Sequence, residues 1–329
     1  MTPDVDTLAA ESRFSGVVRV DRGGELVLER AYGLADRRWD VANAADTRFG
    51  IASGVKGMTA LAVVSLIEDG RLTLDTTARS LLGDDLPLVA DDVTVEHLLA
   101  HRSGIGDYLD EDAGGEITDY VMPVPVHELA STEDFLAVLG GHPTKFAAGT
   151  EFSYSNGGFV VLALLAERAS GVPYHRLVQE RVCAPGGMSA TEFLRSDELP
   201  AGAAVGYLEA DGLRSNVLHL PVRGTGDGGI YTTAADVRAL WKALLAGRIV
   251  SAEWVAEMTR PRSDADGRRY GLGFWLSEST ERVFLEGYDA GVSFRSLHDP
   301  TSDTTCTVIS NWSDGAWPVA KVLGDQLFG

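Results

Sequence analysis

A serine and a lysine three positions apart, Ser53 and Lys56, stand where residues 55–69 predict a helix. Residues three apart share one face of a helix, so the lysine amine reaches the serine hydroxyl. The unpaired N–H groups of a first helical turn also face any negative charge that develops there. Burial and the positive helix end lower a lysine pKa from its usual value of about 10.4, which favours a neutral amine. The pair therefore predicts a nucleophilic serine activated by lysine.

A second element with chemical potential is Tyr154-Ser155-Asn156. In an extended loop, residues two apart point the same way, so Tyr154 and Asn156 are expected to face one cleft. A phenol near a lysine ammonium is pushed toward tyrosinate, which is a proton acceptor. The Asn156 amide can hydrogen-bond both Lys56 and a substrate carbonyl. Alone, this tripeptide is ordinary loop sequence; only together with Ser53 and Lys56 does it indicate an active site.

In this order, the two elements resemble the serine β-lactamase and penicillin-binding-protein superfamily. The similarity is greatest to the class C β-lactamase-like branch, which uses Tyr-x-Asn where class A enzymes carry Ser-Asp-Asn. That branch includes D-peptidases, family VIII carboxylesterases and acyltransferases. Further stretches resemble the family in the same order, at residues 49–52, 68–75, 98–105, 149–152 and 228–236.

The resemblance implies a role for each matching residue. Ser53 is expected to be the nucleophile, Lys56 its activating group, and Tyr154 the relay of a proton between serine and leaving group. Asn156 is expected to orient the substrate. His101 is expected to be structural and not the general base. The implied reaction is a two-step acyl transfer through an acyl-enzyme.

The third family element is altered in this chain. It normally reads Lys-Thr-Gly or His-x-Gly on a strand beside the cleft, and its best match here is Leu285, Glu286 and Gly287, so leucine replaces the basic residue. By resemblance, the N–H of Tyr288 completes an oxyanion hole with that of Ser53. Glu286 is expected either to contact substrate or to cap a strand end. Without the cation we expect weaker binding of penicillins and a preference for neutral or cationic acyl substrates.

These residues predict a serine hydrolase that acts on a small-molecule or peptide-like ester or amide through an acyl-enzyme on Ser53. Two alternatives stay open. An acyltransferase would capture the same intermediate with an alcohol or amine, and a catalytically silent binding or regulatory relative would keep only the fold. The altered third element favours the silent relative, whereas the four intact residues of the first two elements oppose it. No metal or organic cofactor is implied.

Strand-like runs at both ends of the chain flank a helical middle. The expected strands are at residues 16–20, 25–32, 270–275, 283–286, 293–297 and 304–310. The expected helices are at residues 55–69, 95–101, 158–170, 233–245 and 318–327. Strands at both ends imply that the two termini share one sheet, with the helical region inserted between them.

We therefore expect an α/β fold of the α+β kind, with an antiparallel sheet flanked by helices. The sheet domain is predicted to comprise residues 1–60 and 205–329, and the inserted helical domain residues 61–204, with the active-site cleft between them. The acidic, irregular residues 109–132 are expected to form a flap or a variable surface loop.

Charge and cysteine content limit the partners. With 28 basic and 48 acidic residues, a net charge of −20, the chain would repel nucleic acids and anionic membranes, so neither is expected as a partner. The oligomeric state is left open. Cys183 and Cys306 match no disulfide or zinc pattern and are expected to be buried thiols. An acidic N-terminus without an apolar segment predicts a cytoplasmic protein with no signal peptide.

Overall fold

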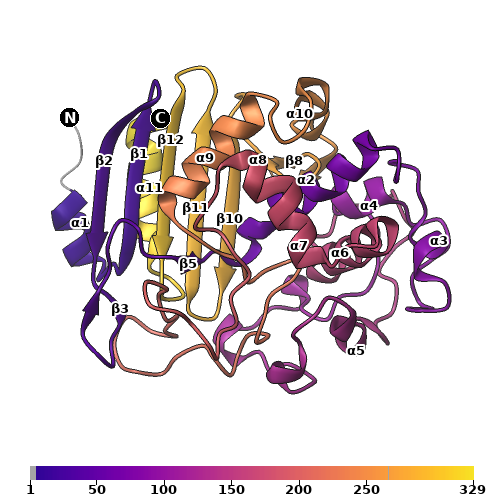
Figure 1. The fold of residues 1–329 in the computed structure, drawn as a ribbon, viewed down its shortest axis with the longest axis horizontal. Helices are drawn as coiled ribbons and strands as arrows, with labels where there is room; N and C mark the ends of the chain where they lie inside the picture. Colours follow the sequence, from indigo (N-terminus) through magenta and orange to yellow (C-terminus); the bar gives the residue numbers. More distant parts are fainter. Residues whose placement is uncertain (1–4, 266) are drawn as a thin grey trace.

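A large antiparallel sheet joins the two ends of the chain (Figure 1). The computed structural model describes residues 5–265 and 267–329, and within them the sheet has eight strands in the order β2-β1-β12-β11-β10-β9-β8-β7. N-terminal β1 (Gly16–Arg22) lies between β2 (Glu25–Tyr32) and C-terminal β12 (Thr304–Ser310). The predicted antiparallel sheet shared by both termini is thus confirmed.

The remaining strands of this sheet are β7 (Ser263–Ala265), β8 (Arg268–Tyr270), β9 (Trp275–Leu276), β10 (Val283–Asp289) and β11 (Val292–Asp299). One expectation is wrong here, because residues 270–275 are not one strand. The chain turns after β8, where Gly271 N–H donates to the Phe274 carbonyl and Gly273 has a φ of +87°. A glycine in that conformation ends a strand, and β9 begins a new one.

Two-stranded pairs complete the β-structure of the described residues: β3 (Leu34–Asp36) with β4 (Val41–Ala42), and β5 (Phe49–Gly50) with β6 (Tyr231–Thr232). The β5–β6 pair is short but important. It ties the segment just before Ser53 to the glycine-rich segment that precedes β6, through residues far apart in the sequence.

Helices cover both faces of the sheet. Helices α1 (Val5–Glu11) and α11 (Ala316–Phe328) share one apolar cluster with Val18 and Val308 of the sheet. Helix α9 (Ala234–Leu245) lies on the opposite face, in the cluster that also holds Val17 and Ile309. Because Val17 and Val18 point to opposite faces of β1, each face has its own core.

Helix α2 (Val55–Glu68) runs through the larger core, and its residues from Val55 to Leu66 are buried. Figure 1 shows it between the sheet and the helices on the far side of the molecule from β2. Those helices are α3 (Ala78–Leu82), α4 (Val95–Leu99), α5 (Leu136–Leu139) and α6 (Asn156–Ser170). Helices α7 (Tyr174–Val178), α8 (Ala184–Gly186) and α10 (Ala252–Met258) complete the fold. Sheet and helices share one apolar cluster, so the boundaries chosen for two domains stay a prediction.

The predicted helices are confirmed with shifted ends. Helix α6 begins two residues early because the Ser155 hydroxyl accepts the N–H of Gly158 as its N-cap. Helix α4 stops at Leu99, before His101 adopts a left-handed φ of +55°. Both cysteines are free and buried, as expected. Within the described residues, no helix combines the length and apolar character needed to cross a membrane.

Candidate active site

Ser53 lies in a single turn of 3-10 helix, η1 (Ala52–Gly54), that leads into α2. Ala52 has a left-handed φ of +44°, which is costly for a residue with a Cβ and marks a sharp turn held by its surroundings. The turn sits against the sheet at Gly54, where an added Cβ would lie 2.5 Å from the Phe294 ring. Ser53 is therefore presented on a tight bend between sheet and helix, half-buried at the mouth of the cleft.

The amine of Lys56 has three partners. It lies 2.8 Å from Ser53 Oγ, 2.8 Å from Asn156 Oδ1 and 3.0 Å from the Asp227 carbonyl oxygen. The last two groups are pure acceptors, and a neutral amine has two N–H donors and one lone pair. In the neutral form of Lys56 both donors are thereby used, which leaves the lone pair for the Ser53 hydroxyl. Lys56 is 2% exposed, and burial lowers its pKa even though the Asp227 and Glu111 carboxylates act in the opposite direction.

The Tyr154 ring covers the lysine. Lys56 Nζ lies 4.8 Å from the ring centroid, and the ring of Tyr154 stacks on Trp275 with centroids 5.9 Å apart. The Tyr154 and Ser53 side chains line the same open pocket. Burial and the Glu111 carboxylate raise the pKa of Tyr154 well above 10, so the expectation of a tyrosinate is wrong. Burial disfavours a charged phenolate, and Tyr270 and the Asp227 carboxylate act in the same direction.

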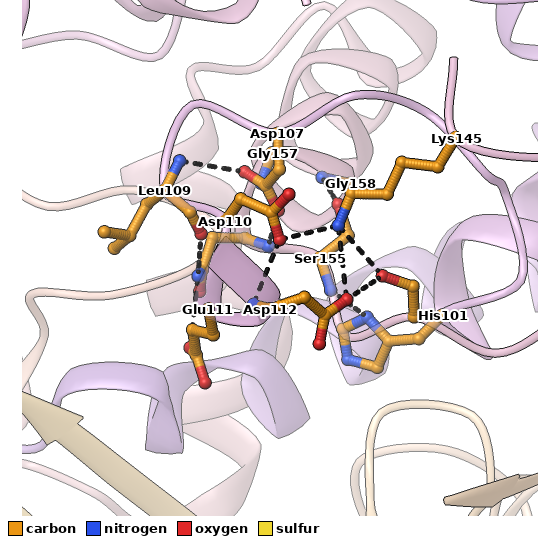
Figure 2. Close-up of polar contacts among 12 residues, drawn as sticks. His101, Asp107, Leu109, Asp110, Glu111, Asp112, Lys145, Ser155, Gly157 and Gly158 are labelled. Atoms are coloured by element: carbon orange, nitrogen blue, oxygen red, sulfur yellow. Dashed lines mark hydrogen bonds and ion pairs between the residues drawn. The ribbon is translucent and has the colours of Figure 1, made fainter. Parts of the chain in front are cut away.

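Asp107 fixes the start of α6 (Figure 2). Its carboxylate accepts the N–H of Asn156 at 2.6 Å and that of Gly157 at 2.8 Å, two donors that a helix N-terminus leaves unpaired. Burial raises the pKa of Asp107, while these backbone donors favour its ionised form. Sequence reasoning missed this residue, which places the Asn156 side chain next to Lys56.

Both the oxygen and the nitrogen of the Asn156 side-chain amide have hydrogen-bond partners. Its Oδ1 accepts from Lys56, and its Nδ2 donates to the Leu109 carbonyl at 2.9 Å and to Glu111 Oε1 at 3.2 Å. Leu109 and Glu111 belong to the acidic segment predicted as a flap or surface loop, and Lys145 fixes the next turn through Asp110 (Figure 2). Sequence reasoning missed Glu111, because no motif includes it.

His101 holds the Tyr154 segment from both sides. Its carbonyl accepts the N–H of Ser153 at 3.0 Å, and its Nδ1 accepts the N–H of Ser155 at 3.0 Å. Its ring centroid lies 4.3 Å from that of Tyr154. Burial and the nearby Lys56 lower the pKa of His101 well below 6.5, so the ring is neutral. The residues on either side of the tyrosine are thus both bound to one histidine.

Strand β10 brings Gly287 and Tyr288 beside η1. Its hairpin to β11 closes with the pair Asp289 and Val292, and pairs of an antiparallel ladder alternate between bonded and non-bonded positions. Tyr288 is one step from the closing pair, so its N–H points away from β11. Gly287 permits this approach, because an added Cβ would lie 2.0 Å from the Ile51 carbonyl oxygen.

The altered positions of the third element have distinct environments. Leu285 is 2% exposed and packs on α2 at Gly57, where an added Cβ would lie 2.7 Å from Leu285 Cδ2. Glu286 pairs with Arg268 at 2.9 Å and with Arg295 at 3.2 Å. A cation therefore does reach this part of the cleft, but it comes from β8 and is already paired with a carboxylate.

Two pockets meet at Ser53, and Glu111 and Tyr288 also line both. The more open pocket has aromatic walls from Phe152, Tyr154, Trp275 and Trp317. The more enclosed pocket has apolar walls that include Leu109, Met122, Phe135, Leu194 and Leu220, with Asp227 and Asp289 near its base. An acyl group and a leaving group can thus occupy different pockets on either side of the serine. Among the described residues, no group of three His, Cys, Asp or Glu side chains is placed to hold a metal ion.

The chain is similar to known proteins over nearly its whole length. A profile of the Beta-lactamase family matches residues 4–323. The chain is similar to a crystal structure of a penicillin binding protein from Bacillus halodurans, with 34% identity, a TM-score of 0.92 and coverage of 98% of this chain and 100% of that one.

Two curated relatives carry different names. Esterase EstB of Burkholderia gladioli is 30% identical over 311 residues, which is 82% of this chain and 76% of the relative. Penicillin-binding protein 4* of Bacillus subtilis (strain 168) is 27% identical over 304 residues, which is 87% of this chain and 65% of the relative. The similarity therefore includes both esterases and penicillin-binding proteins.

Proposed function

The chain belongs to the beta-lactamase family and is a serine hydrolase, and from this premise we propose that it cleaves esters or amides through an acyl-enzyme on Ser53. The observation that carries the proposal is the environment of Lys56. In the neutral amine both N–H donors have acceptors, Asn156 Oδ1 and the Asp227 carbonyl, which leaves the lone pair for the Ser53 hydroxyl at 2.8 Å. A neutral amine at that distance is a general base within reach of its proton.

Acylation would begin when Lys56 takes the proton of Ser53 as Oγ attacks the substrate carbonyl carbon. The N–H groups of Ser53 and Tyr288 would hold the negative oxygen of the tetrahedral intermediate. Tyr154, a neutral phenol because burial raises its pKa, would give its proton to the leaving group and receive one from the Lys56 ammonium. The carbon–leaving-group bond then breaks, and the acyl-enzyme remains with Lys56 neutral again.

Deacylation would reverse the same proton transfers with water as the nucleophile. Lys56 and Tyr154 would take a proton from water, and Ser53 would leave as a hydroxyl. An alcohol or amine in place of water would make the protein an acyltransferase, and an added acceptor that diverts product would reveal it. The hydrogen-bonded Ser53 and Lys56 argue against a silent relative.

The experiment is intact-protein mass spectrometry after brief exposure to p-nitrophenyl acetate or, separately, to a penicillin. Ser53→Ala tests the nucleophile, and Ser153→Ala, which changes a serine lining the same open pocket, is the matched control. We expect an acetyl adduct in the wild type and in Ser153→Ala, and none in Ser53→Ala. An adduct that persists in Ser53→Ala would refute the proposal.

The penicillin arm tests substrate preference. We expect little penicilloyl adduct, because Leu285 is buried and Arg268 is paired with Glu286, which leaves no unpaired cation among the described residues lining the open pocket for the penicillin carboxylate. Rapid, Ser53-dependent acylation by penicillin would refute this preference without refuting the nucleophile.

A further inference from the structure

Asp227 is joined to Lys56 through its backbone and to Tyr108 through its side chain. Its carbonyl oxygen accepts the Lys56 amine at 3.0 Å, and its carboxylate accepts the hydroxyl of Tyr108. Covalent geometry keeps the carbonyl oxygen and carboxylate carbon of one aspartate within about 5 Å, so this carboxylate lies within about 8 Å of Lys56 Nζ. Asp227 is 8% exposed, so little water screens its charge from the amine.

Tyr108 comes from the segment that also positions Asn156. Its neighbours in the chain are Asp107, which accepts the N–H of Asn156, and Leu109, whose carbonyl accepts Asn156 Nδ2. Burial, reinforced by the Asp227 carboxylate, raises the pKa of Tyr108 well above 10. The hydroxyl therefore remains a donor to Asp227, and this hydrogen bond favours the ionised carboxylate.

The backbone of Asp227 is fixed by the residue before it. The Gly226 carbonyl accepts the hydroxyl of Thr59 in α2 at 2.6 Å. An added Cβ at Gly226 would lie 2.1 Å from the Phe159 carbonyl oxygen in α6. The segment thus packs against both α6 and α2, the helix that carries Lys56, and this packing holds the carboxylate at a set distance from the amine.

Asp227 is the carboxylate with the largest effect on Lys56. The other titratable groups that act on the amine or face it are three carboxyl groups, a neutral imidazole and a neutral phenol: Asp107, Glu111, Asp289, His101 and Tyr154. Burial raises the pKa of Asp107, and that of Asp289 to about 7. Burial also raises the pKa of Asp227, whereas Lys56 and the Tyr108 hydroxyl act in the opposite direction.

We propose that Asp227, held by Tyr108, is a positioning residue whose negative charge balances the ammonium formed on Lys56 while Ser53 attacks. This inference rests on the proposed acyl-enzyme at Ser53. As the bond from Oγ to the substrate carbonyl carbon forms, the Ser53 proton passes to Lys56 Nζ, so a positive charge appears on the amine and a negative one on the carbonyl oxygen. Asp227 neither gains nor loses a proton. Its charge makes Lys56 a stronger base and stabilises the developing ammonium.

The test is the pH profile of kcat/KM for p-nitrophenyl acetate in the wild type and in Asp227→Asn. The amide keeps the size of the side chain and the backbone carbonyl that binds Lys56, but it removes the charge. A unit charge within about 8 Å in a poorly screened site changes a pKa by about one pH unit or more. We therefore expect the acid limb to move to lower pH by about that amount. The plateau above the limb should fall about 3–10-fold, because a weaker base accepts the proton less readily.

These two changes oppose each other at acidic pH, where a lower pKa leaves more of Lys56 neutral. The two profiles should therefore cross, with Asp227→Asn equal to or above the wild type well below both limbs. A merely structural role of Asp227 would lower kcat/KM by one factor at every pH. A uniform loss or an unmoved limb would overturn the proposal.

Tyr108→Phe tests the partner of Asp227. It removes the donor that favours the ionised carboxylate and leaves the carboxylate in place. We expect the limb to move in the same direction by a smaller amount, and to move no further when the change is added to Asp227→Asn. An unmoved limb, or the same movement in both backgrounds, would overturn the role of Tyr108. Thermal unfolding shows whether each variant is folded, and if Asp227→Asn is not, the limb of Tyr108→Phe decides the proposal.

Asp264→Asn is the matched control. It also replaces a pocket carboxylate by an amide, but Asp264 is an exposed residue of β7 that lines the open pocket. Because solvent screens an exposed charge, we expect the acid limb to stay within about 0.3 pH unit of the wild type. An equal movement in Asp264→Asn and Asp227→Asn would show an effect of total charge and overturn a specific role of Asp227.

A fluorophosphonate probe that labels active-site serines separates this inference from the function on which it rests. Labelling of the wild type but not of Ser53→Ala, together with an unmoved limb in Asp227→Asn, would overturn only the role of Asp227. Absence of labelling and of turnover in the wild type would overturn both proposals. Ser53-dependent labelling together with a limb that moves to lower pH in Asp227→Asn supports both.

Discussion

Substituting Gly287 by alanine tests whether β10 positions the proposed oxyanion hole. An added Cβ would lie 2.0 Å from the Ile51 carbonyl oxygen and 3.1 Å from Gly54 N, and both atoms are backbone. Carbon and carbonyl oxygen normally stay above about 3.3 Å apart, so strand and η1 must separate by roughly 1 Å. Since Ser53 and Tyr288 lie on the two separating segments, their N–H groups would no longer converge.

The expected loss in kcat/KM is about 100-fold, the size associated with a 1 Å displacement of catalytic groups. Overpacking should also cost about 1–3 kcal/mol of stability, so both ester kinetics and the free energy of unfolding are measured. Gly324→Ala is the control: this glycine lies in α11 with nothing within 4 Å of an added Cβ, and the change should add about 0.5–1 kcal/mol without altering kinetics. A folded Gly287→Ala with kcat/KM within about threefold of the wild type would refute the close approach.

Three further predictions follow from the same site. Lys56 must be neutral to act as a base, and burial lowers its pKa, so kcat/KM should fall with decreasing pH along a limb that lies below pH 10.5. Lys56→Met should lower kcat/KM about 10²–10⁴-fold at every pH. His101→Leu removes the acceptor for Ser155 N–H and should lower kcat about tenfold with little change in KM. His101→Asn keeps an acceptor and tolerates a positive φ, so it should retain more activity. Equal losses in the two variants would show that the histidine is merely structural. Glu286→Gln frees Arg268 and should raise kcat/KM for a succinyl ester by about fivefold relative to a propionyl ester, measured at constant ionic strength.

Local sequence patterns predicted much of the scaffold. The strands at both ends alternate and are bounded by turn residues, so their pairing in one sheet followed from the order of elements. The reach from Lys56 to Ser53 follows from helix geometry alone, and the structure has it at 2.8 Å. The turn at Gly271 and Gly273 was missed because its flanking residues continue an aromatic, strand-like run.

The electrostatics of the site could not be predicted in this way. Glu111, Asp227 and Arg268 come from separate loops and strands, and they meet only through the tertiary fold. No spacing in the sequence relates them. The direction of the Tyr154 pKa was predicted wrongly for the same reason, since it depends on how deeply the phenol and the lysine are buried and not on their separation along the chain.

Burial of Lys56 links these electrostatic features. Burial favours the neutral form of both groups, so the lowered pKa of Lys56 and the raised pKa of Tyr154 have one cause. The carboxylates of Asp227 and Glu111 oppose that neutrality, because both favour a lysine ammonium.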